Sequence, residues 1–577
     1  MKSLGYLNKY FIKYKWRFIL GILFTVLTNY FNVKMPLFVQ STLDSFKTVK
    51  IDSLQGALWF SAKVAMIYIA LSLTKGFFLF LMRQTIIIMS RLIEFDLKNE
   101  IFKQYERLDF SFYKRNRTGD LMNRISEDVS QVRMYLGPGI MYSINLIVMS
   151  IMVVNAMVNI NGFLTFMALL PLPIMSLMIY KVSSKMGKYS KHVQESQSNL
   201  TSIAQETFAG IRIFKAHNKE HIVEDKFEEA SSTYKERTLK LAFVNAFFMP
   251  TILFLIGMST LLSIYIGGLM FYSGKVTEGE IVALILFVNQ LTWPFASIGW
   301  VTSIIQRAGA SQKRINEFLN EKTSIQTDTI IPIEFQGKIE FKHVSYTYPD
   351  TGIKAIDQLS FILQPHQTIA VLGKTGAGKS TLLALILRQI DPDQGEILID
   401  DVPLKNIDLK AFYQHIGIIP QDVFLFSDTI KNNISFGLQD EVSQSVIETY
   451  AKKAHVHHNI IEFPEGYDTL LGERGVNLSG GQKQRISIAR ALIKQPKLLL
   501  IDDCLSAVDT ETEEIILNNF KDLDCSSIIV SHRISTIRNA NFILYLEGGK
   551  KKEEGTHETL YQLKGEYYQL YKSQSES

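Results

Sequence analysis

The sequence is poor in cysteine and, over long stretches, in charge. Only two of its 577 residues are cysteines, Cys504 and Cys525, which are too few and too close together for a disulfide framework. No Asp, Glu, Lys or Arg occurs within residues 134–180, 241–274 or 281–306, whereas charge has its ordinary density after these stretches. The uncharged stretches exclude a wholly soluble or disordered protein, and the charged remainder excludes a membrane protein without a soluble domain.

An excess of charge of one sign is also lacking. The chain has 61 Lys and Arg against 56 Asp and Glu, so its formal net charge is only +5, and its mean hydropathy is +0.09. A net charge this small argues against nucleic acid as the main partner. The length suggests several domains, at about 150 residues for each domain.

The apolar stretches predict six membrane spans, because one span needs about 20 mostly apolar residues. The predicted spans lie, in chain order, near 18–43 and 57–82, twice within 134–180 with a turn over 159–162, and over 241–274 and 281–306. Lys34, Lys63 and Lys75 fall within or near the first two spans. A lysine at such a place either reaches the membrane interface or faces a cavity.

Basic residues set the expected orientation. They precede the first span and are frequent in residues 83–133 and 181–240, but they are sparse in the loops near 44–56, 159–162 and 275–280. Both termini are therefore expected in the cytosol, with the two long basic stretches continuing the spans as cytosolic helices. No cleavable signal is expected, because the first apolar stretch is full length and lacks a small-residue cleavage site.

The pattern changes after residue 310. Residues 311–336 read as a polar linker between a membrane domain over 1–310 and a second domain over 337–577. In the second domain, short β-branched runs alternate with helical stretches, which is typical of an α/β fold. The runs predicted as strands are Ile339–Phe341, Gln367–Leu372, Glu396–Ile399, Leu498–Ile501 and Ser527–Val530.

One segment of this domain predicts a nucleotide site. It fits the phosphate-binding pattern G-x-x-x-x-G-K-[ST] in full, follows an apolar strand and opens the helical run Thr381–Arg388; its residues are Gly373, Lys374, Thr375, Gly376, Ala377, Gly378, Lys379 and Ser380. The glycines let backbone N–H groups point at phosphate oxygens. Lys379 is expected to neutralise the β and γ phosphates, and Ser380 to hold Mg²⁺.

Two further segments extend this site. The strand that ends at Asp502 places a carboxylate where a phosphate-binding fold needs one beside its metal, although such a strand is weak evidence alone. A second anion site is predicted where a serine and two glycines open the run Lys483–Leu492, a helix N-terminus being a natural anion site. This second segment consists of Leu478, Ser479, Gly480, Gly481 and Gln482.

On these motifs the chain resembles a half-transporter of the exporter type in the ABC transporter family, over nearly its whole length. The resemblance implies that Tyr348, with Tyr346 as the alternative, stacks on adenine. It also implies that Gln421 senses Mg²⁺ and that His532 contacts the γ-phosphate. Four other segments look like family elements: the cytosolic coupling segments Phe112–Leu121 and Gln205–Arg212, the segment Gly472–Gly475, and the interface loop Ser506–Asp509.

The family implies a head-to-tail dimer in which each Leu478–Gln482 segment closes over the other subunit's phosphate-binding loop. Asp503 departs from the family, which has glutamate after the Walker B aspartate. The carboxylate is then drawn back by about 1.5 Å, and a misplacement of about 1 Å can cost on the order of 10²-fold in rate. The favoured interpretation is a degenerate site in one member of a heterodimer; a slower but working base, and a homodimer, are the alternatives.

The predicted function is therefore ATP-driven export or flipping of amphipathic molecules, drug-like compounds or lipids, across a bacterial plasma membrane. A dedicated lipid flippase and an ATP-gated channel or regulator on the same fold remain as alternatives, whereas a DNA-repair ATPase does not fit six spans. Cargo contacts are expected from Lys34 or Lys75, if either faces a cavity. The aromatic candidates in the last span are Trp293, Phe295 and Trp300.

Overall fold

The computed structural model divides the chain into two compact units. It describes residues 2–46, 54–325, 331–438, 440–472, 475, 477–505 and 508–575. The membrane unit comprises residues 1–107 and 117–321, and the α/β unit comprises residues 108–116 and 322–577. The helix that precedes the expected linker continues to Leu319, so the first part of the segment 311–336 is helical.

The membrane unit is all-helical. Among its described residues, six helical segments are long and apolar enough to cross a membrane, as predicted: Lys15–Phe46, Leu54–Arg107, Thr118–Ile160, Gly162–Ala209, Glu220–Tyr272 and Glu278–Leu319. The individual elements are η1 (Lys2–Leu7), α1 (Asn8–Lys13), α2 (Lys15–Ser45), α3 (Leu54–Arg107), α5 (Thr118–Asn123), η2 (Arg124–Asp128), α6 (Val129–Met134), η3 (Tyr135–Gly139), α7 (Ile140–Ile160), α8 (Gly162–Leu169), α9 (Pro171–Ala209), α10 (Ile211–Ala216), α11 (Glu220–Tyr272) and α12 (Glu278–Leu319).

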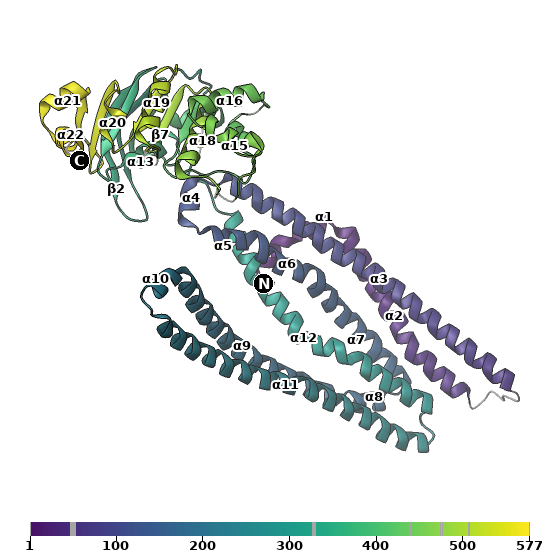
Figure 1. Ribbon diagram of the computed structural model, residues 1–577. Helices are drawn as coiled ribbons and strands as arrows, with labels where there is room; N and C mark the ends of the chain where they lie inside the picture. Colours follow the sequence, from purple (N-terminus) through teal and green to yellow (C-terminus); the bar gives the residue numbers. More distant parts are fainter. Residues whose placement is uncertain are drawn as a thin grey trace. The chain divides into compact units, whose positions relative to one another are not determined.

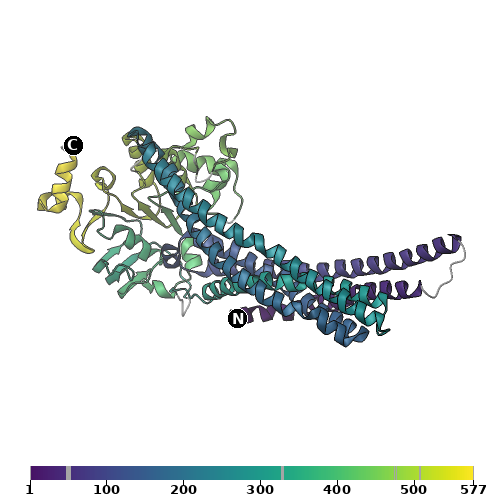
Figure 2. The same ribbon diagram turned by 90° about the horizontal axis from the view of Figure 1, so that it is seen from below.

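Long antiparallel helix pairs build this unit. Helices α9 and α11 run side by side in both views, and α2 pairs with α3 in the same way (Figures 1 and 2). Helix α12 packs against α2, α7 and α11 and so joins the pairs. Residues 83–107, 181–209 and 220–240 are helical extensions of apolar spans, which confirms that the long basic stretches continue as helices.

The α/β unit contains two sheets. A six-stranded sheet has the order β10-β9-β3-β8-β7-β6, in which β9, β3, β8, β7 and β6 are mutually parallel and β10 is antiparallel to β9. A four-stranded antiparallel sheet has the order β2-β1-β4-β5. The strands are β1 (Ile339–Thr347), β2 (Lys354–Leu363), β3 (Thr368–Gly373), β4 (Gln394–Ile399), β5 (Val402–Pro403), β6 (Ile416–Ile419), β7 (Leu498–Asp502), β8 (Ser526–Val530), β9 (Phe542–Glu547) and β10 (Lys550–Gly555).

The helices of this unit, together with its sheets, confirm the α/β class. They are α4 (Phe110–Arg115), α13 (Lys379–Ile386), α14 (Leu409–Gln414), α15 (Ile430–Ser435), α16 (Gln444–Lys453), α17 (His457–Ile461), α18 (Gly480–Leu492), α19 (Thr510–Lys521), α20 (Ile534–Ile537), α21 (His557–Leu563) and α22 (Glu566–Ser575), with 3-10 turns η4 (Leu404–Asn406) and η5 (Gly466–Asp468).

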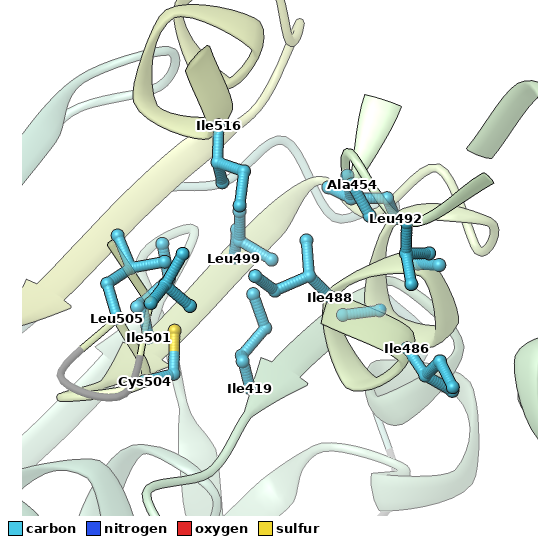
Figure 3. Close-up of a cluster of buried hydrophobic side chains, with 14 of the residues drawn as sticks. Ile419, Ala454, Ile486, Ile488, Leu492, Leu499, Ile501, Cys504, Leu505 and Ile516 are labelled. Atoms are coloured by element: carbon cyan, nitrogen blue, oxygen red, sulfur yellow. The ribbon is translucent and has the colours of Figure 1, made fainter. Parts of the chain in front are cut away.

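A buried apolar cluster holds one face of this sheet. Figure 3 shows Leu499 of β7 and Ile419 of β6 converging on Ile488 of α18. Continuous apolar runs such as that of β7 suit parallel strands whose two faces are both covered. Cys504 belongs to the same cluster and is buried, so it is a packing residue. The packed core fixes the carboxyl ends of the strands, where the candidate site lies.

Candidate nucleotide-binding site

A cleft of about 1100 Å³ lies at the carboxyl ends of three adjacent parallel strands. Strand β8 pairs with β3 on one side and β7 on the other, with Val371, Val530 and Asp502 in register. The segments that follow these strands are the phosphate-binding loop, the pair Asp502-Asp503 and the turn at His532, and residues of all three line the cleft. Ligands of parallel α/β sheets bind at this edge.

Two glycines of the phosphate-binding loop, Gly373 and Gly378, have no room for a side chain. Gly373 and Gly378 have φ angles of 152° and 100°, and a Cβ atom at either would lie 2.3 Å from a backbone carbonyl oxygen. Gly376 has a φ of 82°, which an L residue rarely adopts. The loop therefore keeps its backbone exposed to the cleft at its tip and packed against β2 and β9 at its ends.

Lys379, the first residue of α13, folds back over this loop. Its Nζ donates to the carbonyl oxygens of Gly373 at 2.6 Å and Lys374 at 3.0 Å. Burial lowers the pKa of Lys379, while the charges of Asp503 and Asp502 act in the opposite direction. An ammonium group held in this way is positioned to meet an anion that enters the loop.

Asp502 and Ser380 form the part of the cleft that suits a magnesium ion. Their side chains are hydrogen-bonded, and burial raises the pKa of Asp502, as does the charge of the adjacent Asp503. The described residues contain no group of three or more His, Cys, Asp or Glu that would hold a metal alone. Mg²⁺ is usually bound by one or two carboxylates together with substrate phosphates, so a hydroxyl and a carboxylate beside a phosphate loop fit it.

Asp503 and His532 both line the cleft, and their side chains are in contact. The Nδ1 atom of His532 lies 2.9 Å from Oδ2 of Asp503, whose side chain is 17% exposed. Asp503 has a left-handed φ of 44°, and its backbone N–H donates to the Val530 carbonyl at 2.9 Å. The short carboxylate is therefore directed at the histidine and held there by both its backbone and its side chain.

The two candidate tyrosines have different surroundings. Tyr348 follows the end of β1, lines the cleft, and places its hydroxyl 3.0 Å from Oγ1 of Thr381. Tyr346 is 8% exposed and belongs to the apolar core of the unit. Gln421, which follows β6, also lines the cleft. Of the two alternatives, only Tyr348 is placed for contact with a ligand in the cleft.

The segment Leu478–Gln482 lies elsewhere on the unit. None of its residues lines the cleft. Ser479 is the N-cap of α18 and forms a capping box with Gln482, whose N–H donates to the Ser479 hydroxyl at 3.3 Å and whose Oε1 accepts from the Ser479 N–H at 3.0 Å. Both glycines and Ser479 are open to solvent at least in part. The predicted second anion site is thus formed but is not part of the chain's own cleft.

Sequence reasoning missed the contribution of the C-terminal helix to the cleft. Helix α22 lines it with Glu566, Gln569, Leu570, Ser573 and Gln574. No motif marks these residues, and only their amphipathic spacing indicates a helix. Four residues that the resemblance singled out lie outside the described part of the chain: Glu473, Arg474, Ser506 and Ala507.

The membrane unit has a separate crevice of about 430 Å³. It is lined by Arg83, Gln84, Ile87, Ile88, Pro138, Met141, Tyr142 and Trp300. Tyr142 and Trp300 meet edge to face with ring centroids 5.4 Å apart. Of the predicted aromatic cargo residues, Trp300 alone lines this crevice; Lys34 instead lies with its Nζ 5.4 Å from the ring centroid of Tyr30, on its own helix.

Comparisons with known proteins agree with this architecture. A sequence model of the ABC transporter transmembrane region matches residues 18–295, and one described as ABC transporter matches residues 356–506. The chain is 33% identical over 591 residues to the probable multidrug resistance ABC transporter ATP-binding/permease protein YheI of Bacillus subtilis (strain 168), covering 100% of this chain and 97% of that protein.

Two other relatives and one solved structure are similar. Identity is 36% to the multidrug resistance-like ATP-binding protein MdlA of Escherichia coli (strain K12), covering 83% of this chain and 82% of the relative. It is 32% to the ATP-dependent lipid A-core flippase of Aromatoleum aromaticum, covering 83% and 80%. The structure of a bacterial Atm1-family ABC exporter with ATP bound superposes with a TM-score of 0.78 over 97% of this chain and 98% of that chain, at 24% identity, and shows the shared fold.

Proposed function

Since the chain belongs to the ABC transporter family and couples ATP hydrolysis to transmembrane transport, we propose that it exports or flips amphipathic molecules as one half of a dimer. The fusion of six candidate membrane spans with a phosphate-loop cleft in one chain carries this proposal. The names of relatives, multidrug resistance proteins and lipid A-core flippases, support drug-like compounds or lipids as cargo.

Each predicted site residue receives a role in this proposal. Tyr348 stacks on adenine; Gly373 to Thr381 surround the phosphates, with Lys379 at the β and γ positions. Ser380, Asp502 and Gln421 are the residues that would hold Mg²⁺, which supplies charge neutralisation at the phosphate oxygens when bound. His532 contacts the γ-phosphate, and Asp503 acts on the attacking water as a weak base.

The position of Leu478–Gln482 supports a dimer. The capped N-terminus of α18 does not line the cleft of its own chain. Its presence is explained if it closes over the phosphate-binding loop of a second subunit and binds the phosphates there. We favour a different subunit as the partner, because Asp503 slows hydrolysis in this chain's cleft while its Leu478–Gln482 segment is complete. The partner's cleft would then carry most of the turnover; a homodimer with two slow sites is the alternative.

Two substitutions separate these dimers. In a heterodimer, Ser479→Arg should remove most of the ATPase rate by blocking the partner's cleft, whereas Asp503→Asn should leave much of it. The steady-state ATPase rate of the reconstituted dimer is the measurement. If the chain purified alone hydrolyses ATP at a rate typical of the family, and Asp503→Asn abolishes that rate, the heterodimer is wrong.

The crevice of the membrane unit supports an anionic or zwitterionic cargo. Among the residues that the structure describes, no acid pairs with Arg83, and Gln84, Trp300 and apolar side chains lie around it. A cation at a membrane span is costly unless it meets an opposite charge or water. A charged head group could bind Arg83 while the apolar part of the molecule packs on the aromatic rings; Lys34 and Lys75 are the other basic candidates.

Transport into sealed vesicles tests the cargo proposal. Uptake of an anionic fluorescent amphiphile should require ATP and fall several-fold in Arg83→Gln, while uptake of a cationic amphiphile should change less. The double substitution of Lys34 and Lys75 by Gln is the comparison for the other basic candidates. Equal effects on both classes would contradict the charge preference, and ion current without uphill uptake would favour an ATP-gated channel.

The membrane orientation completes the proposal. We place both termini in the cytosol of a bacterial cell, the α/β unit with them, because basic residues cluster in the segments next to the same ends of the spans. Single cysteines introduced near residue 275 and near residue 570, in a background lacking Cys504 and Cys525, should react with an impermeant thiol reagent in whole cells only at the first position. Labelling of the second would reverse the orientation.

A further inference from the structure

We infer that Gln574, near the end of α22, is a positioning residue for His532 in ATP hydrolysis. Its amide side chain bridges the turn that carries the histidine. Nε2 of Gln574 donates to the His532 carbonyl oxygen at 2.6 Å, and the N–H of Ile534 donates to Oε1 of Gln574 at 2.9 Å. One side chain thus holds the backbone on both sides of Arg533.

The bridge fixes the backbone from which the histidine extends. Within the described part of the chain, no other hydrogen bond reaches the backbone of His532. A side-chain amide is the group that can donate to a carbonyl and accept from an N–H at the same time. The Arg533 N–H, in the same peptide group as the His532 carbonyl, donates to the Ser531 hydroxyl at 3.0 Å. Loss of the bridge would therefore release the His532 carbonyl oxygen and the Ile534 N–H and leave the Ser531 contact as the remaining local restraint, so that the His532 ring can leave its position 2.9 Å from Asp503.

The far side of the turn is held independently. Nη1 of Arg533 donates to Oε2 of Glu513 at 3.0 Å, and the hydroxyl of Thr536 donates to the other oxygen of the same carboxylate. Glu513 is 3% exposed. These bonds anchor the side chain of Arg533 and the start of α20, but they do not reach the His532 peptide groups. Gln574 supplies the restraint that Glu513 does not.

Helix α22 is itself firmly placed, so it can serve as a support. The carboxylate of Glu553 in β10 accepts from the backbone N–H groups of Glu566 at 2.6 Å and Tyr567 at 3.1 Å. Tyr567 is fully buried, and its hydroxyl lies 2.6 Å from Nδ1 of His557. Gln574 is seven residues after Tyr567 and therefore lies on the same face of the helix. A rigid helix carries the restraint to the catalytic turn.

The test measures hydrolysis at this chain's own cleft in the full-length dimer. The protein is loaded with γ-labelled 8-azido-ATP, crosslinked, and followed for loss of label from this chain in a single turnover. Gln574→Met, which keeps the length but removes the amide, should slow this step about 10-fold, in line with the cost of small misplacements. ATP affinity should stay within two-fold. Gln562→Met, at an exposed position of the preceding helix α21 that does not line the cleft, is the matched control and should change neither quantity.

A double-mutant cycle distinguishes positioning from a general structural effect. If Gln574 acts through His532, Gln574→Met should have no further effect in a His532→Ala background. Gln574→Glu retains the acceptor but not the donor, so it provides a second variant of nearly the same shape and should also slow the step. An equal slowing by Gln574→Met with and without His532, or the same rate for Gln574→Met and Gln562→Met, would overturn the inference. The test depends on ATP hydrolysis alone and is independent of the cargo and of the partner's identity.

Discussion

The two units of the chain place apolar and polar side chains in opposite ways. In the membrane unit, large apolar residues face outward: Trp59 is 71% exposed and Leu253 is 62% exposed. In the α/β unit, Leu499 and the other apolar residues of β7 are buried. An apolar outer surface is stable only where lipid replaces water. Large apolar side chains therefore form an outer surface as well as a core in the membrane unit, whereas in the α/β unit they lie mainly in the core.

Polar groups show the reverse arrangement. In the membrane unit, Asn29 is 2% exposed and its Nδ2 donates at 2.9 Å both to Oδ1 of Asn145 and to the carbonyl of Thr25. Lipid provides no hydrophobic driving force for the association of helices, so hydrogen bonds of this kind help to hold the helices together. In the α/β unit, the polar residues that matter lie at the open ends of buried strands, as Asp503 and His532 do. Polar side chains thus connect helices inside the membrane unit, whereas in the α/β unit they line the nucleotide-binding cleft.

The largest effect should come from a core truncation in the α/β unit. Leu499→Ala should lower the free energy of opening of β7 by about 3 kcal/mol, because a buried leucine truncated to alanine loses its apolar contacts and leaves a cavity. Leu253→Ala in α11 is the matched control and should change little, since its side chain faces outward. Hydrogen exchange of the full chain in lipid nanodiscs measures both. A large loss at Leu253 would show that it packs against protein.

A change of charge in the cleft should have the next largest effect. Lys379→Ala should weaken ATP binding by roughly 10- to 100-fold, because a hydrogen bond to a charged group is worth about 1.5–3 kcal/mol. Lys410→Ala removes the same charge from an exposed position of α14 and should leave the affinity unchanged. Binding is measured by titration of the full chain with a fluorescent ATP analogue. Near-normal affinity in Lys379→Ala would contradict the assignment of the cleft.

The sequence predicted what local signals encode. Hydropathy located the six spans, and one eight-residue pattern located the phosphate-binding loop with its strand and helix. The contact of Gln574 with His532 joins residues 42 positions apart, and no periodicity or motif indicates such a bond. The sequence also could not decide which of Tyr346 and Tyr348 faces the ligand, because residues two apart in a strand lie on the same face. The structure distinguishes them: β1 has register shifts and ends at Thr347, between the two tyrosines.

The buried asparagine of the membrane unit should have a smaller effect. Asn29→Leu should destabilise the packing of α2 on α7 by about 1 kcal/mol, since interhelical hydrogen bonds in membranes are worth about 0.6–2 kcal/mol and Asn145 would lose this partner. Asn155→Leu, at an exposed position of α7, is the control. Hydrogen exchange of α2 in nanodiscs is the measurement. No change in Asn29→Leu would indicate that the buried amide does not hold these helices together.

The smallest effect should come from Lys114, a residue of α4. Nζ of Lys114 lies 4.0 Å from the ring centroid of Tyr348, in the geometry of a cation–π contact. Such a contact at an exposed site is worth about 0.5–1 kcal/mol, and an adenine ring stacked on the same face of Tyr348 would have to displace it. Lys114→Ala should therefore tighten ATP binding about two- to five-fold, whereas Arg115→Ala on the same helix should leave it unchanged. Titration with ATP is the measurement. Unchanged affinity in Lys114→Ala would mean that adenine stacks on the other face of the Tyr348 ring. Weaker binding would mean that Lys114 contacts the nucleotide itself. A tightening that disappears in a Tyr348→Leu background would assign the effect to the ring and make α4 a restraint on nucleotide entry.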